Sequence, residues 1–216
     1  MSGWEGDNIQ RLIELVGGNV NEDFDTLQQR SIDAHNLRFA DFINNNDIVL
    51  DFGSGLGFGA NTFADNVSHY VCADVSRTML MSAQQNTSHH TKVDLKLISR
   101  NDLSALKDYK FTKIISHAVF VHLEIPEIIF YLKQFKNILA HNGEVLFTYK
   151  NLDLLDVNDT LLNDHTERLM RNREFQTRSI SYVSPTVIKN IAEQIGYKYV
   201  EVECDDFDRT ARLINE

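Results

Sequence analysis

The chain has 216 residues, of which 31 are acidic and 21 basic, and its formal net charge is −10. This length suits one domain with a full hydrophobic core, and the negative charge disfavours nucleic acid, whose binding needs a basic surface. No apolar run approaches the ~20 residues that span a membrane, and the N-terminus lacks a secretory pattern. We therefore expect a cytoplasmic protein without a membrane partner. The two cysteines show no metal-ligand or disulfide spacing, so no metal is expected.

Two helices are expected before the first strand. An apolar stripe from Ile9 to Val16 recurs at helical spacing and ends at a pair of glycines. A second helix is expected from Thr26 to Ile43. Residues 1–46 are thus expected to form an N-terminal helical region that precedes the first strand and turn of the domain.

A buried strand followed by a glycine-rich turn is the most informative feature of the chain. The strand Ile48–Phe52 leads into the pattern Asp51-x-Gly53-x-Gly55-x-Gly57. Glycine lets the backbone turn sharply and approach a ligand closely. The unpaired amides that open the helix after the turn suit a carboxylate or a phosphate. A strand, a glycine turn and a helix at this spacing indicate a nucleotide-type cofactor site.

The same glycines leave a second cofactor class open. The dinucleotide fingerprint G-x-G-x-x-G/A fits formally as Gly55-x-Gly57-x-x-Ala60. However, the expected end of the strand makes Gly53 the first glycine, and Phe58 then occupies the position of the third. An NAD(P)-dependent oxidoreductase therefore stays as an alternative, and Phe58 argues against it.

An acidic residue follows the second expected strand, His69–Ala73. Asp74 lies 17 residues after Gly57, close to the ~20-residue offset at which an acid meets a ribose in dinucleotide folds. A carboxylate at the end of a strand can accept hydrogen bonds from both ribose hydroxyls. Ser76 is expected to cap the next helix, Arg77–Asn86.

Strands and helices alternate through the rest of the chain. The further expected elements are a helix from Asn61, strand Val93–Ile98, a strand ending at Ser116-His117, helix Ile125–Ala140, strand Glu144–Tyr149, a helix from Pro185 to Ile195, and strands Tyr199–Cys204 and Thr210–Ile214. This alternation predicts an α/β fold, a doubly wound sheet with helices on both faces.

The motifs resemble those of the class I S-adenosylmethionine-dependent methyltransferases that act on small molecules. The glycine pattern resembles the first motif of that family, Asp74-Val75-Ser76 followed by Met79 resembles the second, and residues 113–149 resemble the region from the fourth to the fifth strand. The resemblance implies a single domain with the Rossmann-like methyltransferase fold, a mostly parallel seven-stranded sheet whose last strand is antiparallel. It divides the chain into a helical cap (1–46), a cofactor-binding core (47–149), an acceptor lid (150–180) and a C-terminal helix with strands (181–216).

The resemblance also implies S-adenosylmethionine as the cofactor. Asp74 would bind its ribose, and Asp102 or the neighbouring Asn101 would accept from the adenine amino group; capping of a short helix is the alternative role of Asp102. The residues expected at the cofactor are Asp51, Gly53, Ser54, Gly55, Gly57, Asp74, Val75, Met79, Asn101, Asp102, Leu103, Ser116 and His117.

Methyl transfer needs a base only when the acceptor arrives protonated. His117, at the end of the fourth strand, is the first candidate because the pKa of histidine lies near working pH, and Tyr149 is the second. A residue at the position of His117 can also act through its backbone alone.

The expected acceptor is a small molecule that is methylated at oxygen or nitrogen. Candidate residues for its pocket are Trp4, Phe24, His35 and Arg38. An arginine cluster that includes Arg168 and Arg171 makes an anionic acceptor one option, and a charge-paired surface helix is the alternative reading of that cluster. A non-catalytic protein that binds the cofactor as a scaffold also stays open.

Overall fold

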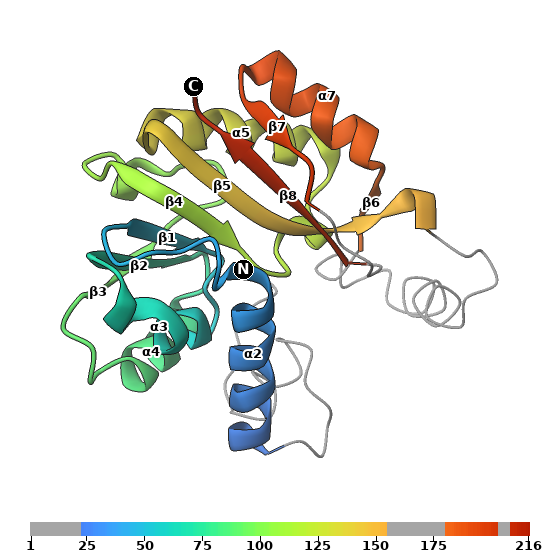
Figure 1. Ribbon diagram of the computed structural model, residues 1–216. Coiled ribbons are helices and arrows are strands. Elements are labelled where there is room, and N and C mark those ends of the chain that lie inside the picture. Colours follow the sequence, from blue (N-terminus) through green and yellow to red (C-terminus); the bar gives the residue numbers. More distant parts are fainter. Residues whose placement is uncertain (1–22, 155–179, 203–207) are drawn as a thin grey trace.

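The computed structural model describes residues 23–154, 180–202 and 208–216. These residues form one sheet with helices on both faces (Figure 1). The strands lie in the order β3-β2-β1-β4-β5-β8-β7, and the short β6 pairs with β5 off this path. Their bounds are β1 Ile48–Phe52, β2 His69–Asp74, β3 Val93–Leu97, β4 Phe111–Ser116, β5 Leu139–Asn151, β6 Tyr182–Val183, β7 Lys198–Val200 and β8 Asp208–Ile214.

The direction of the strands confirms the predicted fold. All pairings among β1 to β6 are parallel, whereas β8 lies antiparallel between β5 and β7. The main path thus has seven strands, is mostly parallel and has an antiparallel last strand, as predicted. The parallel strands end at one common edge, and open α/β sheets bind their ligands beyond that edge.

The alternation of side chains along each strand divides the core into two layers. In β1, Val49 packs toward α2 and α3, and Leu50 and Phe52 pack toward α5 and α7. Figure 1 shows α2, α3 and α4 on the first side and α5 and α7 on the second. The helix bounds are α2 Phe24–Phe39, α3 Phe58–Phe63, α4 Arg77–Asn86, α5 Ile125–Ile138 and α7 Pro185–Ile195, with short 3₁₀ turns η1 Ala64–Asn66, η2 Ser104–Leu106, η3 Phe120–His122 and η4 Leu152–Leu154.

Helices α2, α3 and α5 differ from their expected bounds, α2 at both ends, and local reasons explain the changes in α3 and α5. Helix α3 begins earlier than expected, at Phe58, because Gly57 adopts the left-handed conformation with φ 80° and forms the N-cap. Helix α5 ends at Ile138, and β5 begins at the next residue. Gly143 lies within β5. It allows a close approach within the sheet, since a Cβ there would lie 3.0 Å from the Phe111 carbonyl oxygen.

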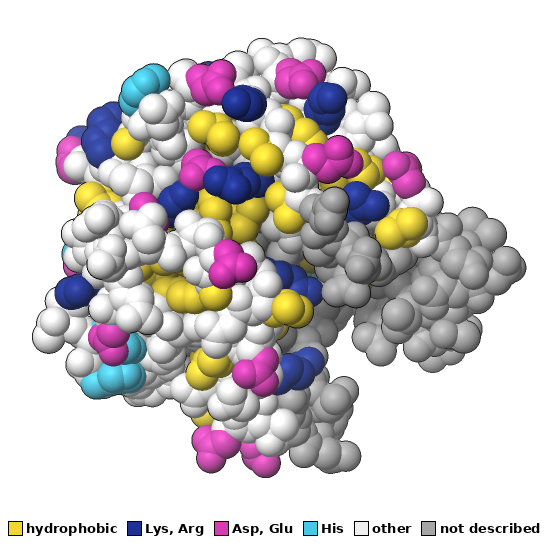
Figure 2. Space-filling model, in the orientation of Figure 1, with side chains coloured by type: hydrophobic (Ala, Val, Ile, Leu, Met, Phe, Trp, Pro, Cys, Tyr) yellow, Lys and Arg dark blue, Asp and Glu magenta, His cyan; other side chains and the backbone are white. Residues whose placement is uncertain are grey.

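A buried ion-pair cluster lies on the α2 side of the sheet. Glu144 on β5 pairs with Lys113 on β4 and, at 2.5 Å, with Arg212 Nε on β8, and both cations lie over the Phe42 ring. In Figure 2, acidic and basic side chains lie over a hydrophobic surface at the level of β4 and β5. Because Lys113 is only 9% exposed, its ammonium group has little contact with water and pairs with the Glu144 carboxylate instead.

Glu144→Ala is expected to lower the free energy of unfolding by about 3 kcal/mol, because removing one partner of a buried pair leaves the other charge uncompensated. Urea unfolding measures this loss. The matched control is Glu216→Ala, which removes an exposed ion pair with Lys198; such pairs contribute roughly 0–1 kcal/mol. Equal losses in the two variants would show that Lys113 does not depend on Glu144.

Candidate cofactor site

Left-handed backbone shapes the glycine loop after β1. Gly53, Gly55 and Gly57 have φ values of 77°, 53° and 80°, which residues with a Cβ rarely adopt. A Cβ at Gly53 would also overlap the side chain of Val119, which lies beyond β4. The Gly53 amide donates to the Ala73 carbonyl on β2 at 2.8 Å. The loop is thus fixed between the ends of β2 and β4.

Asp74 joins this loop to the end of β2. Its carboxylate accepts from the Gly55 amide at 2.9 Å and from the Ser76 amide at 2.8 Å. Ser76 caps α4, as predicted, by accepting from the Met79 amide. A carboxylate offers about four acceptor sites, so it can hold the loop and receive ribose hydroxyls at the same time.

Asp51 lies buried beneath the glycine loop, on the α3 side of the sheet. Its Oδ2 accepts from the Tyr70 hydroxyl at 2.9 Å, and burial raises the pKa of the carboxyl to about 7. Helix α3 passes over this pair at Gly59, where a Cβ would come within 2.5 Å of Asp51 Oδ2 and 2.6 Å of the Tyr70 oxygen. The sequence interpretation missed Tyr70 and Gly59. The alternation along β2, which places Tyr70 on the α3 side, is the signal that could have found the first of them.

Three apolar residues expected at the cofactor have side chains in the core. Met79 is buried with Leu56 and Phe58, whereas Leu103 is buried on the α5 side of the sheet and Val75 packs against the same core. Their side chains therefore stabilise the elements around the expected adenine site. Any contact of these residues with a cofactor stays a prediction.

Asp102 forms hydrogen bonds with the first residue of a short helix, η2, whose N-cap is Leu103. Its exposed carboxylate accepts from the Ser104 amide at 2.8 Å and from the Ser104 hydroxyl at 3.0 Å, at the start of η2. These hydrogen bonds lower the pKa of Asp102. Asn101 is exposed beside it. The assignment of either residue to adenine stays a prediction.

The two serines of the expected site lie at the ends of β1 and β4. Ser116 Oγ donates to the Phe52 carbonyl at 2.9 Å and so ties β4 to β1. The Ser54 amide donates to the Ala73 carbonyl at 3.2 Å, next to the bond from Gly53. The Ser116 hydroxyl is therefore used as a donor within the sheet, and the residue would contact a ligand through its backbone.

His117 follows β4 directly and packs against α2. Its ring lies edge-on to His35, with 4.9 Å between ring centres, and to Phe39 at 6.2 Å. Burial, together with the neighbouring His35 and Arg38, lowers the pKa of His117 to about 3. The expectation of a pKa near working pH is therefore wrong, and so weakly basic an imidazole is a poor general base.

We expect His117 to stay neutral from pH 8 down to pH 5, because its pKa in the folded chain lies below this range. An NMR titration of its ring Cε1–H signal measures this. The variant His117→Asn assigns the signal, and the other histidines of the chain serve as internal references. A titration midpoint between pH 6 and 7 would restore His117 as a candidate base.

Tyr149, the second candidate base, is also unsuited to that role. The residue is 1% exposed and lies in the core on the α5 side of the sheet. Burial, and the nearby Tyr199, raise the pKa of its hydroxyl. The hydroxyl therefore keeps its proton at neutral pH and serves as a hydrogen-bond donor.

Helix α2 carries three of the pocket candidates and places two of them against the start of α3. The Phe24 ring centre lies 5.7 Å from that of Phe58, and the buried His35 ring lies over Gly59. Arg38 is half-buried on the same helix. The candidates outside the described residues are Trp4, Arg168 and Arg171, with most of the expected acceptor lid.

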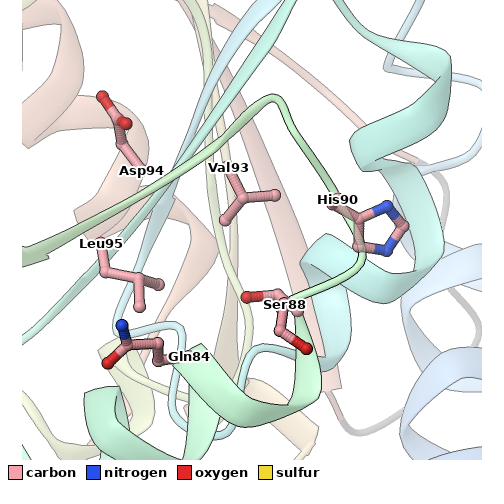
Figure 3. Close-up of a pocket in the computed structure, with 7 residues that line it drawn as sticks. Gln84, Ser88, His90, Val93, Asp94 and Leu95 are labelled. Atoms are coloured by element: carbon pink, nitrogen blue, oxygen red, sulfur yellow. The ribbon is translucent and has the colours of Figure 1, made fainter.

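A surface pocket of about 260 Å³ lies away from these strand ends, between the end of α4 and the edge strand β3 (Figure 3). Its lining residues are Gln84, Thr87, Ser88, His90, Val93, Asp94 and Leu95. None of them is a predicted cofactor residue. We therefore place the candidate cofactor site at the ends of the parallel strands and not in this pocket. Within the described ranges no three His, Cys, Asp or Glu side chains are grouped to hold a metal ion, and no helix is long and apolar enough to cross a membrane.

Known proteins share both the domain and the fold. Residues 49–143 match the family model described as a methyltransferase domain, and no curated protein matches the chain. Magnesium protoporphyrin IX methyltransferase from Synechocystis PCC 6803 with bound SAH has a TM-score of 0.66 at 14% identity, over 96% of this chain and 92% of that one. A SAM-dependent methyltransferase from Aquifex aeolicus has a TM-score of 0.65 at 14% sequence identity, and the match covers 98% of this chain and 100% of that one. A methyltransferase complexed with the Haloferax volcanii Trm112 methyltransferase activator has a TM-score of 0.65 at 15% sequence identity, and the match covers 88% of this chain and 94% of that one.

At these identities the likeness to solved structures shows the fold alone, which the chain shares with these methyltransferase structures. The matched domain covers the glycine loop, Asp74 and the strands up to the start of β5. Residues 49–143 thus match a methyltransferase-domain model, and the chain shares the fold of solved S-adenosylmethionine-dependent methyltransferases, as the resemblance implied.

Proposed function

We propose that the chain transfers a methyl group from S-adenosylmethionine to an oxygen or nitrogen atom of a small molecule in the cytoplasm. One observation carries this proposal: Asp74 accepts from the Gly55 amide, so the expected ribose acceptor and the glycine loop form one unit at the ends of β1 and β2. S-adenosylmethionine fits this site. A carboxylate at the end of a strand can accept from a ribose diol, and glycines in the left-handed conformation let the backbone come close to the cofactor.

In this proposal the residues of the chain bind the cofactor and position the acceptor. Asp74 receives the ribose hydroxyls while it holds the loop through Gly55. When bound, the cofactor supplies an electrophilic methyl carbon on its sulfonium. Holding the acceptor atom in line with that carbon can contribute ~7–11 kcal/mol to catalysis. His117 and Tyr149 are unsuited as bases, so the acceptor would react through a free lone pair and lose any proton to solvent.

The fold alone leaves the acceptor open. The Synechocystis neighbour is named for magnesium protoporphyrin IX, and the Haloferax neighbour is assembled with an activator protein. Because one fold hosts many reactions, the acceptor has to be argued from the site itself. A small-molecule acceptor is our proposal, and assembly with a protein partner is the alternative for the same domain.

The test is transfer of labelled methyl from S-adenosylmethionine into fractionated pools of small molecules by the full chain. We expect label in one or a few fractions, and much less with Asp74→Ala at the same cofactor concentration. Label that enters only protein fractions would reject the small-molecule acceptor. Tight cofactor binding with no transfer into any fraction would favour the scaffold alternative.

A further inference from the structure

An arginine and a tyrosine face each other near the ligand edge of the sheet. Tyr149 on β5 and Arg209 on β8 are directly paired in the antiparallel register. Their side chains therefore lie on the same face of the sheet, with Cβ atoms about 5 Å apart. Figure 1 shows β8 alongside β5, with the start of β8 nearest β6, which pairs with the last residues of β5. Open α/β sheets bind their ligands at this edge.

Both side chains carry a buried hydrogen-bond donor. Tyr149 Oη and Arg209 Nε have no hydrogen-bond partner among the residues that the structure describes. Other buried tyrosine hydroxyls donate to protein acceptors, namely those of Tyr70, Tyr131 and Tyr197. Native structures rarely leave buried donors unpaired. The two orphaned donors, adjacent across the strands, therefore point to a ligand that supplies the acceptors.

The chemistry of the pair selects an acidic ligand. The guanidinium is always charged, and burial raises the pKa of Tyr149, so its hydroxyl remains a donor. The Tyr199 hydroxyl lies close enough to raise the pKa of Tyr149, but Tyr149 Oη forms no hydrogen bond among the described residues. The exposed Asp153 accepts from Ser184 at 3.4 Å. In the described part of the chain no ion pair neutralises Arg209. A fixed cation next to a neutral O–H donor matches a carboxylate or a phosphate.

We propose that Tyr149 and Arg209 bind an oxyanion of the methyl acceptor, a carboxylate or a phosphate. This inference rests on the proposed methyl transfer and narrows its substrate class to acidic small molecules. The oxyanion receives the Arg209 Nε–H and the Tyr149 O–H. Both residues determine specificity and position the acceptor, and neither serves as a base.

The test is calorimetric titration of the full chain, saturated with S-adenosylhomocysteine (SAH), with benzoate, inorganic phosphate and the neutral benzamide. Arg209→Met is compared with Arg212→Met, which removes the same charge from the same strand but on the other face, where Arg212 pairs with Glu144. We expect wild type and Arg212→Met to bind one of the anions in the millimolar range, and Arg209→Met to bind it at least tenfold more weakly. Benzamide should not bind. The preferred anion distinguishes a carboxylate from a phosphate.

Tyr149→Phe supplies an independent readout. Without ligand it should unfold at the same urea concentration as wild type or a higher one, because its hydroxyl has no partner in the described residues; with SAH it should bind the anion several-fold more weakly. A marked loss of stability, equal anion binding by Arg209→Met and Arg212→Met, or no anion binding by a wild type that binds SAH would each overturn the proposal. SAH titrated alone reports on the proposed function separately, so the two failures are distinguishable.

Discussion

Asp51→Asn is expected to stabilise the folded chain at pH 8 and to leave its stability almost unchanged at pH 4. Burial raises the pKa of Asp51 from 3.8 to about 7. Between these values the folded chain holds a proton that the unfolded chain has released. Wild-type stability therefore falls by about 1.4 kcal/mol for each pH unit through this window and levels off above it. Asparagine keeps an acceptor for the Tyr70 hydroxyl and carries no charge to bury, so the variant escapes this loss.

Urea unfolding of wild type and Asp51→Asn from pH 4 to pH 8 measures the difference. The control is Asp33→Asn, which removes an exposed carboxyl on α2 that accepts from Gln29. Affinity for S-adenosylmethionine at pH 8 should fall in Asp51→Asn, because a negative charge beneath the glycine loop is lost. A gap in stability that does not change with pH, or a variant that is less stable at pH 8, would show that Asp51 is ionised in the folded chain throughout.

Asp74→Ala is expected to weaken SAH binding at least tenfold, because each charge-assisted hydrogen bond to the ribose contributes about 1.5–3 kcal/mol. The same variant should lower the free energy of unfolding by about 2 kcal/mol, since the amides of Gly55 and Ser76 lose their acceptor. Calorimetry and urea unfolding of one preparation measure both effects. Unchanged SAH affinity in Asp74→Ala would make the ribose assignment wrong.

Asp102→Ala is the matched control, because it removes the same charge from an exposed carboxylate at the end of the neighbouring strand. It loses the cap on Ser104 and should change stability by less than about 1 kcal/mol. Its effect on SAH affinity also decides between the two roles considered for Asp102. A large loss of affinity supports adenine binding, and an unchanged affinity leaves capping as its only role.

Most of the fold was predictable because its signals are local. The cap at Ser76 and the strands β1 and β2 depend on neighbouring residues, and the structure confirms them. The start of α3 was missed because Gly57 takes a backbone conformation that the pattern of apolar residues does not reveal. The end of α5 was missed because Gly143 is required by a contact with a distant strand.

The candidate site was predictable only in part, because burial and long-range contacts are invisible in the order of residues. The glycine pattern and the spacing to Asp74 place these groups together correctly, but the bond between Asp74 and Gly55 requires the structure. His117 was proposed as a base on its ordinary pKa, and packing against His35 removes that basis. The Tyr70 hydroxyl on Asp51 joins residues from two strands, and no local motif indicates it.

Calorimetric titration of the full chain with SAH and, in a second experiment, with NADH tests the cofactor assignment most directly. The glycine loop held by Asp74, with Phe58 in the place of a third glycine, predicts saturable one-to-one binding of SAH and no binding of NADH. Binding of NADH without binding of SAH would contradict the methyltransferase assignment and favour an oxidoreductase.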